Sequence, residues 1–152
     1  MRRSFAVVGV VVCLGFGGSN LASHAGRAAH DACIRPTTLS VGTSTKDGRL
    51  SGVPIPSRRG RVWALPLGKL PVEAGGDLKI VWRATGRGPL RVVFRNPDGR
   101  AHAFDGPTPH LVSNFDRPGQ EWGTIFPFDA PGCWTIGLAR HGTSATIRIT
   151  AT

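Results

Sequence analysis

The sequence predicts one small all-β domain built as a sandwich or a barrel. Its 152 residues include 21 glycines and 12 prolines, which suit short strands and tight turns and disfavour long helices. Apolar and polar residues alternate with a period of two, turn signals recur about every 8–12 residues, and no segment has helical periodicity. An apolar content of 40% allows one modest core at this length.

The middle of the chain has the clearest strand pattern. In residues 77–84 and 90–95 every second side chain is apolar, as in a half-buried strand. The turn signal at 96–99 follows, and residues 100–104 are expected to return as the hairpin partner. Further strands are expected at 39–41, at 62–65 (ended by Pro66), at 111–114, 121–128, 133–139 and 145–149, with turns at 129–132 and 140–143. We count seven or eight short strands, with Trp63, Trp82, Trp122 and Trp134 supplying much of the aromatic core.

The N-terminal segment has the pattern of a secretory signal peptide. Arg2 and Arg3 precede the apolar stretch 5–16, and small and polar residues continue to Ala25. The apolar stretch is too short to cross a bilayer as a helix, which takes about 20 residues. We expect cleavage after Ala25 and a secreted or cell-envelope protein without an integral membrane span. A twin-arginine route and an uncleaved anchor remain alternatives.

The predicted organisation therefore has three parts: a signal peptide (1–25), a lead-in (26–36) and one domain (37–152). The mature chain keeps two cysteines, Cys33 and Cys133. An even number of cysteines in an exported chain indicates a disulfide, and two cysteines allow a single pairing. In the chain-entropy model, a loop of about 100 residues contributes at most about 4–5 kcal/mol to stability.

The segment 121–136 (EWGTIFPFDAPGCWTI) carries a family resemblance. It resembles the C-terminal signature, of the type F-P-x-x-G-C-W-x-V/I, of a group of small exported bacterial proteins. Cys33 and the segments 62–65 and 76–83 fit the same group. The resemblance implies an immunoglobulin-like β-sandwich. It also implies a protein of uncharacterised, accessory or binding role, and it transfers no catalytic residue to this chain.

Charge is the strongest functional signal in the sequence. The chain has 19 basic residues and nine acidic ones, and Arg58, Arg59 and Arg61 form the densest basic cluster. A second set is expected on the outward face or the connecting loop of the central strands: Arg83, Arg87, Arg91 and Arg95. Such an excess favours anionic partners. Nucleic acid is not expected, because the chain is exported and its aromatic residues are needed in the core. We expect a non-catalytic module that contacts anionic cell-envelope polymers or another envelope protein. A merely solvated sheet face is the competing interpretation of the arginines.

An enzyme is the alternative function. A metal- or carboxylate-dependent site would require His102, Asp105 and His110 to converge in one cleft. No histidine or cysteine pair has the spacing of a recognised metal motif, and no Gly-x-Ser-x-Gly nucleophile motif occurs. A blue-copper site lacks its axial methionine, since the only methionine is Met1. We therefore expect no metal, no cofactor and no catalysis.

Overall fold

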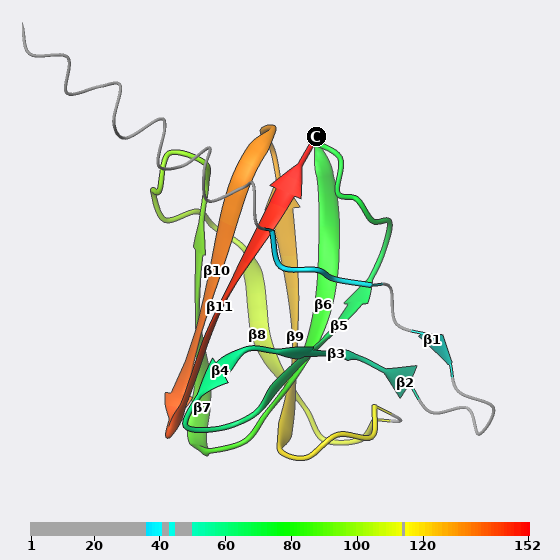
Figure 1. Cartoon of the computed structure of the whole chain (residues 1–152), viewed down its shortest axis with the longest axis vertical. Coiled ribbons are helices and arrows are strands. Elements are labelled where there is room, and N and C mark those ends of the chain that lie inside the picture. The colour runs from blue at the N-terminus through cyan, green and yellow to red at the C-terminus, as the bar shows by residue number, and fades with distance from the viewer. Residues whose placement is uncertain (1–35, 41–42, 45–49, 114) are drawn as a thin grey trace, which may run out of the picture.

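The computed structural model describes residues 36–40, 43–44, 50–113 and 115–152. They form two antiparallel sheets that face each other across one core (Figure 1). One sheet has five strands in the order β3 (Val53–Ile55), β5 (Val62–Leu67), β6 (Gly76–Ala84), β9 (Gln120–Phe128) and β8 (Asp105–His110). The other has four in the order β4 (Ser57–Arg58), β11 (Thr143–Ala151), β10 (Gly132–His141) and β7 (Arg87–Arg95).

A separate two-stranded sheet pairs β1 (Thr43–Ser44) with β2 (Leu50–Ser51). The predicted all-β class is confirmed, and no helix occurs in the part of the chain that the structure describes. That part accordingly contains no helix long and apolar enough to cross a membrane. The predicted signal peptide, nearly all of the predicted lead-in and Cys33 lie outside the described residues.

An aromatic cluster joins the two sheets. Phe94 of β7 stacks on Trp134 of β10, with ring centroids 4.7 Å apart. Across the core, Phe94 meets Phe126 and Phe128 of β9 at 4.9 and 5.4 Å. Each of these rings is at most 1% exposed. Because such ring contacts add to the gain from apolar burial, this cluster holds the two sheets in register.

A second, smaller cluster covers the outer face of the five-stranded sheet. Val81 points away from the main core, since its neighbours along β6 face inward, yet it is only 5% exposed. Leu65 of β5 and Phe115 pack beside it, with Trp63 at the margin. Phe115 is fully buried although it belongs to the loop after β8. The part of this loop at Phe115 therefore packs on the sheet.

Proline lies on or beside every edge of the two large sheets. Pro54 lies in β3, Pro107 and Pro109 lie in β8, and Pro89 lies in β7. The fourth edge, β4, is two residues long and follows Pro56. Proline has no backbone N–H to donate to a neighbouring strand, so it is best tolerated where a strand lacks a neighbour on one side. Pro66 of β5 and Pro127 of β9 fit this rule, because they lie beyond the residues that pair with the edge strands β3 and β8.

Five of the strand predictions are confirmed with small shifts of their ends, namely those for β6, β7, β9, β10 and β11. The prediction that Pro66 ends the strand at 62–65 is wrong, because β5 continues to Leu67. Residues 39 and 40 are not in a strand, and Val41 lies outside the described residues. Trp63 is half-buried, whereas Trp82, Trp122 and Trp134 are in the main core as expected.

Two further strand predictions are wrong. Residues 100–104 form only a single bridge, Arg95–Ala101, with the strand before them. The chain then crosses to the other sheet, where β8 pairs with β9. The predicted edge strand at 111–114 does not form either, because residues 111–113 bend into a loop and Asn114 lies outside the described residues.

One buried polar contact offers a test of the core. The indole nitrogen of Trp82 donates to the hydroxyl of Thr124 at 2.8 Å, and that hydroxyl donates to the carbonyl of Ile80 at 3.1 Å. Thr124→Val keeps the side-chain shape but leaves the buried N–H without its acceptor. We expect a loss of about 1–3 kcal/mol in the free energy of unfolding, measured by urea denaturation.

Thr146→Val is the matched control. Thr146 is exposed on β11, so the same exchange there should change stability by less than about 0.5 kcal/mol. Equal effects at both positions would contradict a specific role for the Trp82–Thr124 bond.

Candidate functional site

Four chain segments meet at one end of the two-sheet body, the lower end in Figure 1. The backbone N–H of Arg61 donates to the hydroxyl of Thr85 at 2.9 Å, and the hydroxyl of Thr143 donates to the carbonyl of Thr85 at 2.8 Å. Arg83 Nη1 donates to the carbonyl of Gly119 at 2.9 Å. We call the described residues of segments 57–61, 83–91, 110–121 and 140–144 the basic end.

Glycine makes this close approach possible. At Gly119 the backbone has a φ of +100°, and a Cβ would lie 2.3 Å from the carbonyl oxygen of Ala84. At Gly86 the φ is +108°, and a Cβ would lie 2.5 Å from the carbonyl oxygen of His141. A larger residue at either position would separate the segments, because it needs both space and a backbone conformation that side chains disfavour.

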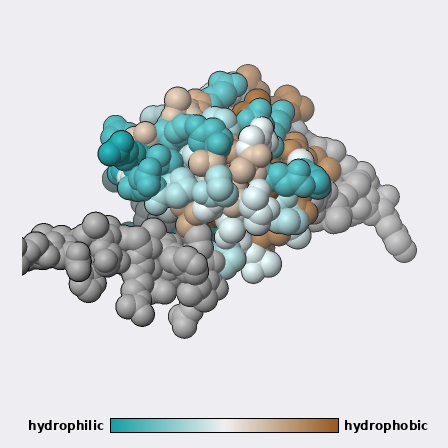
Figure 2. Space-filling view, turned by 90° about the horizontal axis from the view of Figure 1, so that it is seen from above, coloured by the Kyte–Doolittle hydropathy of each residue, from teal (hydrophilic) through white to brown (hydrophobic). Residues whose placement is uncertain are grey.

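The charge excess of the described chain lies entirely in the basic end. The described residues include 13 basic and seven acidic side chains. Eight of the basic side chains and two of the acidic ones belong to the basic end, which leaves five of each sign for the rest. The eight are Arg58, Arg59, Arg61, Arg83, Arg87, Arg91, Arg117 and Arg140. Figure 2 looks onto the opposite end, where hydrophilic side chains cover much of the visible face.

The predicted cluster Arg58, Arg59 and Arg61 lies in this region, and all three side chains are exposed. Arg58 pairs with Ser144 at the start of β11, and Arg59 has a φ of +58° in the turn that follows β4. Sequence reasoning found these three because they are neighbours in the chain. The sequence also offers Arg83, Arg87 and Arg91 as candidates on the central strands, but it does not show that the fold brings them, together with Arg117 and Arg140, to the same end.

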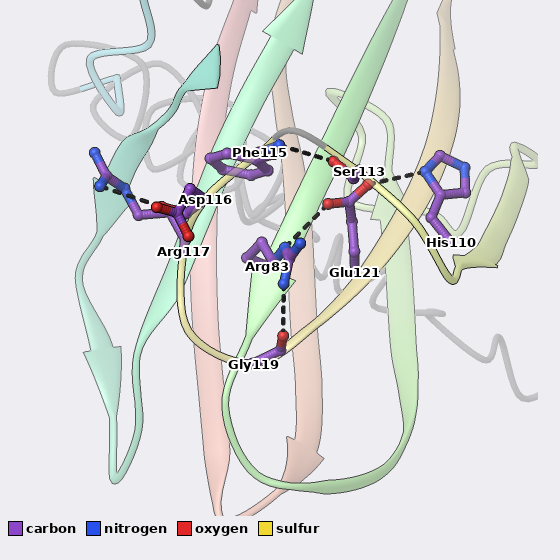
Figure 3. Close-up of polar contacts among 8 residues, drawn as sticks. All are labelled: Arg83, His110, Ser113, Phe115, Asp116, Arg117, Gly119 and Glu121. Carbon is purple, nitrogen blue, oxygen red and sulfur yellow. Dashed lines mark hydrogen bonds and ion pairs between the residues drawn. The ribbon is translucent and has the colours of Figure 1, made fainter. Parts of the chain in front are cut away.

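A groove of about 520 Å³ opens at the basic end beside β8 and β9. Its lining includes Arg83, Pro89, His110, Leu111, Glu121 and Trp122. Figure 3 shows Glu121 between Arg83 and His110. One carboxylate oxygen of Glu121 lies 3.0 Å from Arg83 Nε, and the other lies 3.1 Å from His110 Nδ1.

Glu121 is a buried carboxylate, since its side chain is 3% exposed. A buried charge is tolerated when it is paired and hydrogen-bonded, and here Arg83 and His110 supply the partners. Both oxygens of the Glu121 carboxylate already have partners in these contacts. The described residues that line the groove include no second carboxylate. The arrangement therefore orders the loop after β8 but lacks the carboxylate pair of a glycoside hydrolase.

Arg140 is the second buried ion at this end, and its acceptors are neutral oxygens. Its Nη1 donates to the carbonyl of Ala84 at 2.7 Å and its Nε to the carbonyl of Gly88 at 2.7 Å, while Nη2 donates to the side-chain oxygen of Gln120. The guanidinium also lies 4.6 Å from the ring centre of Trp122. Burial removes solvent from the guanidinium and lowers the pKa of Arg140 from its usual value.

The residues of the enzyme alternative do not converge. His102 Nε2 contacts the carboxylate of Asp129 at 3.3 Å, whereas His110 contacts Glu121. Asp105 begins β8, and its neighbour across the sheet is Ile125 of β9. No group of three histidine, cysteine or acidic side chains in the described segments is placed to hold a metal ion.

The predicted disulfide stays a prediction. Cys133 is half-buried at the start of β10, opposite Thr150 of β11. Its expected partner, Cys33, precedes the described residues.

Comparison with known proteins adds no assignment. No family model matches the chain, and neither a curated protein nor a solved structure matches it. The fold and the site together define the class: an all-β, two-sheet protein with an arginine-rich end.

Arg140 offers a test of how this end is held together. Arg140→Met removes the donor from three acceptors, two of which are backbone carbonyls. We expect a loss of about 2–4 kcal/mol in unfolding free energy by urea denaturation, since buried acceptors would lose their partner.

Arg91→Met serves as the control, because Arg91 is exposed on the neighbouring strand β7. That exchange removes the same charge and should cost less than about 0.5 kcal/mol. A loss for Arg140→Met no greater than for Arg91→Met would show that the guanidinium does not hold the two sheets together.

Proposed function

We propose that this chain is an exported, non-catalytic binding module with an immunoglobulin-like β-sandwich fold. In this proposal, it binds anionic polymers of the cell envelope through the basic end, with Arg58, Arg59 and Arg61 as part of the contact surface. The observation that carries the proposal is the confinement of the whole charge excess to one end of the described chain.

The strand order supports an immunoglobulin-like fold. If β5 to β11 are lettered A to G, the larger sheet reads A-B-E-D and the smaller one reads G-F-C. This is the order of a constant-type immunoglobulin domain. β3 and β4 are additions beside strands A and G. The chain departs from antibody domains in its cysteines, because Cys133 lies in the strand lettered F but Cys33 precedes the strand lettered A.

Exposure of the arginines supports an electrostatic contact. Arg58, Arg59, Arg61, Arg87 and Arg91 are all exposed, so their charges are available to a partner. Glu121, one of the two acids at this end, is already paired with Arg83 and in contact with His110. A surface with one dominant sign attracts polymers of the opposite sign and raises their association rate.

A binding role is favoured over the enzyme alternative for a structural reason. The enzyme alternative requires His102, Asp105 and His110 in one cleft, whereas the fold keeps these residues in separate contacts. The groove beside β9 contains a single, fully paired carboxylate.

Polyphosphate is a suitable first probe, because it carries phosphate charge and no apolar part. We expect the protein to bind immobilised polyphosphate at about 0.05 M salt and to elute by about 0.5 M, since salt screens exposed charges. Replacing Arg58, Arg59 and Arg61 by serine should weaken binding about tenfold, as three exposed ionic contacts are lost.

Replacing Arg95, Arg100 and Arg148 by serine is the matched control. These arginines are also exposed, and their replacement lowers the net charge by the same amount, but they lie outside the basic end. The control should bind almost as well as the unchanged protein. Equal losses in both triple variants would indicate attraction by net charge alone and would overturn the assignment of a binding end.

Export and disulfide formation are tested together by intact mass. The full chain, produced in a bacterium with its own leader, should be recovered outside the cytoplasm as a species that begins at Gly26. Its mass should be lower by two hydrogens than after reduction, because Cys33 and Cys133 pair. A recovered chain that still carries residues 1–25, or an unchanged mass on reduction, would contradict the respective prediction.

A further inference from the structure

Two aliphatic side chains protrude at the basic end. Leu111 is 98% exposed and Val112 is 94% exposed. The other large apolar residues that are exposed in the described chain, Leu67, Val93 and Ile125, are between 37% and 44% exposed. Those three are partly covered by strand neighbours, whereas Leu111 and Val112 contact almost nothing. We call these two residues the apolar tip.

The loop that carries the apolar tip is anchored rather than loose. It leaves β8 at His110, which is bonded to the buried Glu121. It returns at Phe115, which is fully buried against Leu65 and Val81. The backbone N–H of Phe115 also donates to the hydroxyl of Ser113 at 2.9 Å, as Figure 3 shows. The tip is thus held outward by fixed contacts on both sides.

The protrusion is not needed to bury the core. In this loop Phe115 supplies the apolar cover of the outer sheet face, and Leu111 and Val112 add nothing to either core cluster. Two adjacent aliphatic side chains that remain almost fully in water are a candidate contact for an apolar partner.

Charge identifies which apolar partner fits. Leu111 lines the same groove as Arg83, and the groove continues along Gly88 to the pocket lined by Arg87 and Arg91. The partner must therefore combine a dense negative surface with an apolar interior beneath it. A polyanion offers only the first property. An anionic bilayer offers both, since phosphate headgroups cover the acyl chains.

We propose that the basic end docks on the surface of an anionic lipid bilayer, with Leu111 and Val112 inserted below the headgroups and the arginines on the phosphates. This rests on the proposed function, because the same arginines supply the attraction to anionic groups. It adds a partner, a lipid surface, and a second set of contact residues that a soluble polyanion would not use.

Vesicle co-sedimentation tests the proposal with the protein purified after export. It should sediment with phosphatidylglycerol vesicles and stay in solution with phosphatidylcholine vesicles. The double variant Leu111→Ser, Val112→Ser should bind phosphatidylglycerol vesicles about tenfold or more weakly, because the apolar contribution to membrane affinity is lost. Its binding to immobilised polyphosphate should be unchanged.

A tryptophan probe reports insertion directly. The native Trp82, Trp122 and Trp134 are at most 4% exposed, so a quencher in the lipid does not reach them. Trp63 is half-buried, and any quenching of its emission is subtracted by measuring the unchanged protein in the same vesicles. In Val112→Trp, we expect bromine-labelled phosphatidylglycerol to quench the added emission. Val93→Trp is the control, since Val93 is exposed on β7 outside the apolar tip and should give no added quenching.

The outcomes separate the two proposals. If the double serine variant binds vesicles as tightly as the unchanged protein, or Val112→Trp is not quenched, the lipid proposal is wrong while polyanion binding stands. If neither vesicles nor polyphosphate are bound at low salt, the proposed function fails and the lipid proposal fails with it. Equal binding to both vesicle types would overturn the role of the arginines.

Discussion

The guanidinium of one arginine links the two large sheets at one end of this protein. Arg140 comes from β10 of the four-stranded sheet, and its acceptors include the carbonyl of Gly88 in β7 and the carbonyl of Ala84 in β6. One charged group therefore spans the gap between the sheets where the aromatic core ends. A hydrocarbon side chain could fill the space, but it would leave those carbonyls without donors. This side chain thus links β10 to the segments at Ala84, Gly88 and Gln120.

The same arrangement explains why so many positive charges are tolerated together. Arg140 is held by carbonyl and amide oxygens and Arg83 by a buried carboxylate, so two of the eight arginines are used inside the structure. Most of the others are exposed at the rim, where water and salt reduce their mutual repulsion. The end is thus stiff in its interior and strongly charged at its surface. That combination presents charges to a partner in a fixed arrangement.

The sequence predicts those elements whose pattern is local. Residues 77–84 and 90–95 alternate because one face of each strand is buried, and this alternation is visible without the fold. It does not reveal which sheet a strand joins. Residues 100–104 follow a strong turn signal, yet the chain crosses to the other sheet after one bridge. The sequence of a turn specifies its geometry but carries no information about the sheet beyond it.

The candidate site was predictable only in part for a similar reason. Arg58, Arg59 and Arg61 are adjacent and stand out in composition. Arg140 lies in a segment that reads as an ordinary turn, and its inward direction comes from acceptors on strands more than 50 residues earlier in the chain. Val81 occupies an outward position in β6 and is buried in a cluster with Leu65 and with Phe115 from the loop after β8. Such contacts between distant segments leave no local signal.

The prolines at the sheet edges limit how copies of this protein can associate. A strand from a second copy could extend a sheet only by hydrogen bonding to a free edge, and three of the four edge strands, β3, β7 and β8, contain proline. Each proline lacks one backbone donor and so hinders the growth of a continuous intermolecular sheet from its strand. Copies crowded together at one surface would therefore join edge to edge less readily at these strands.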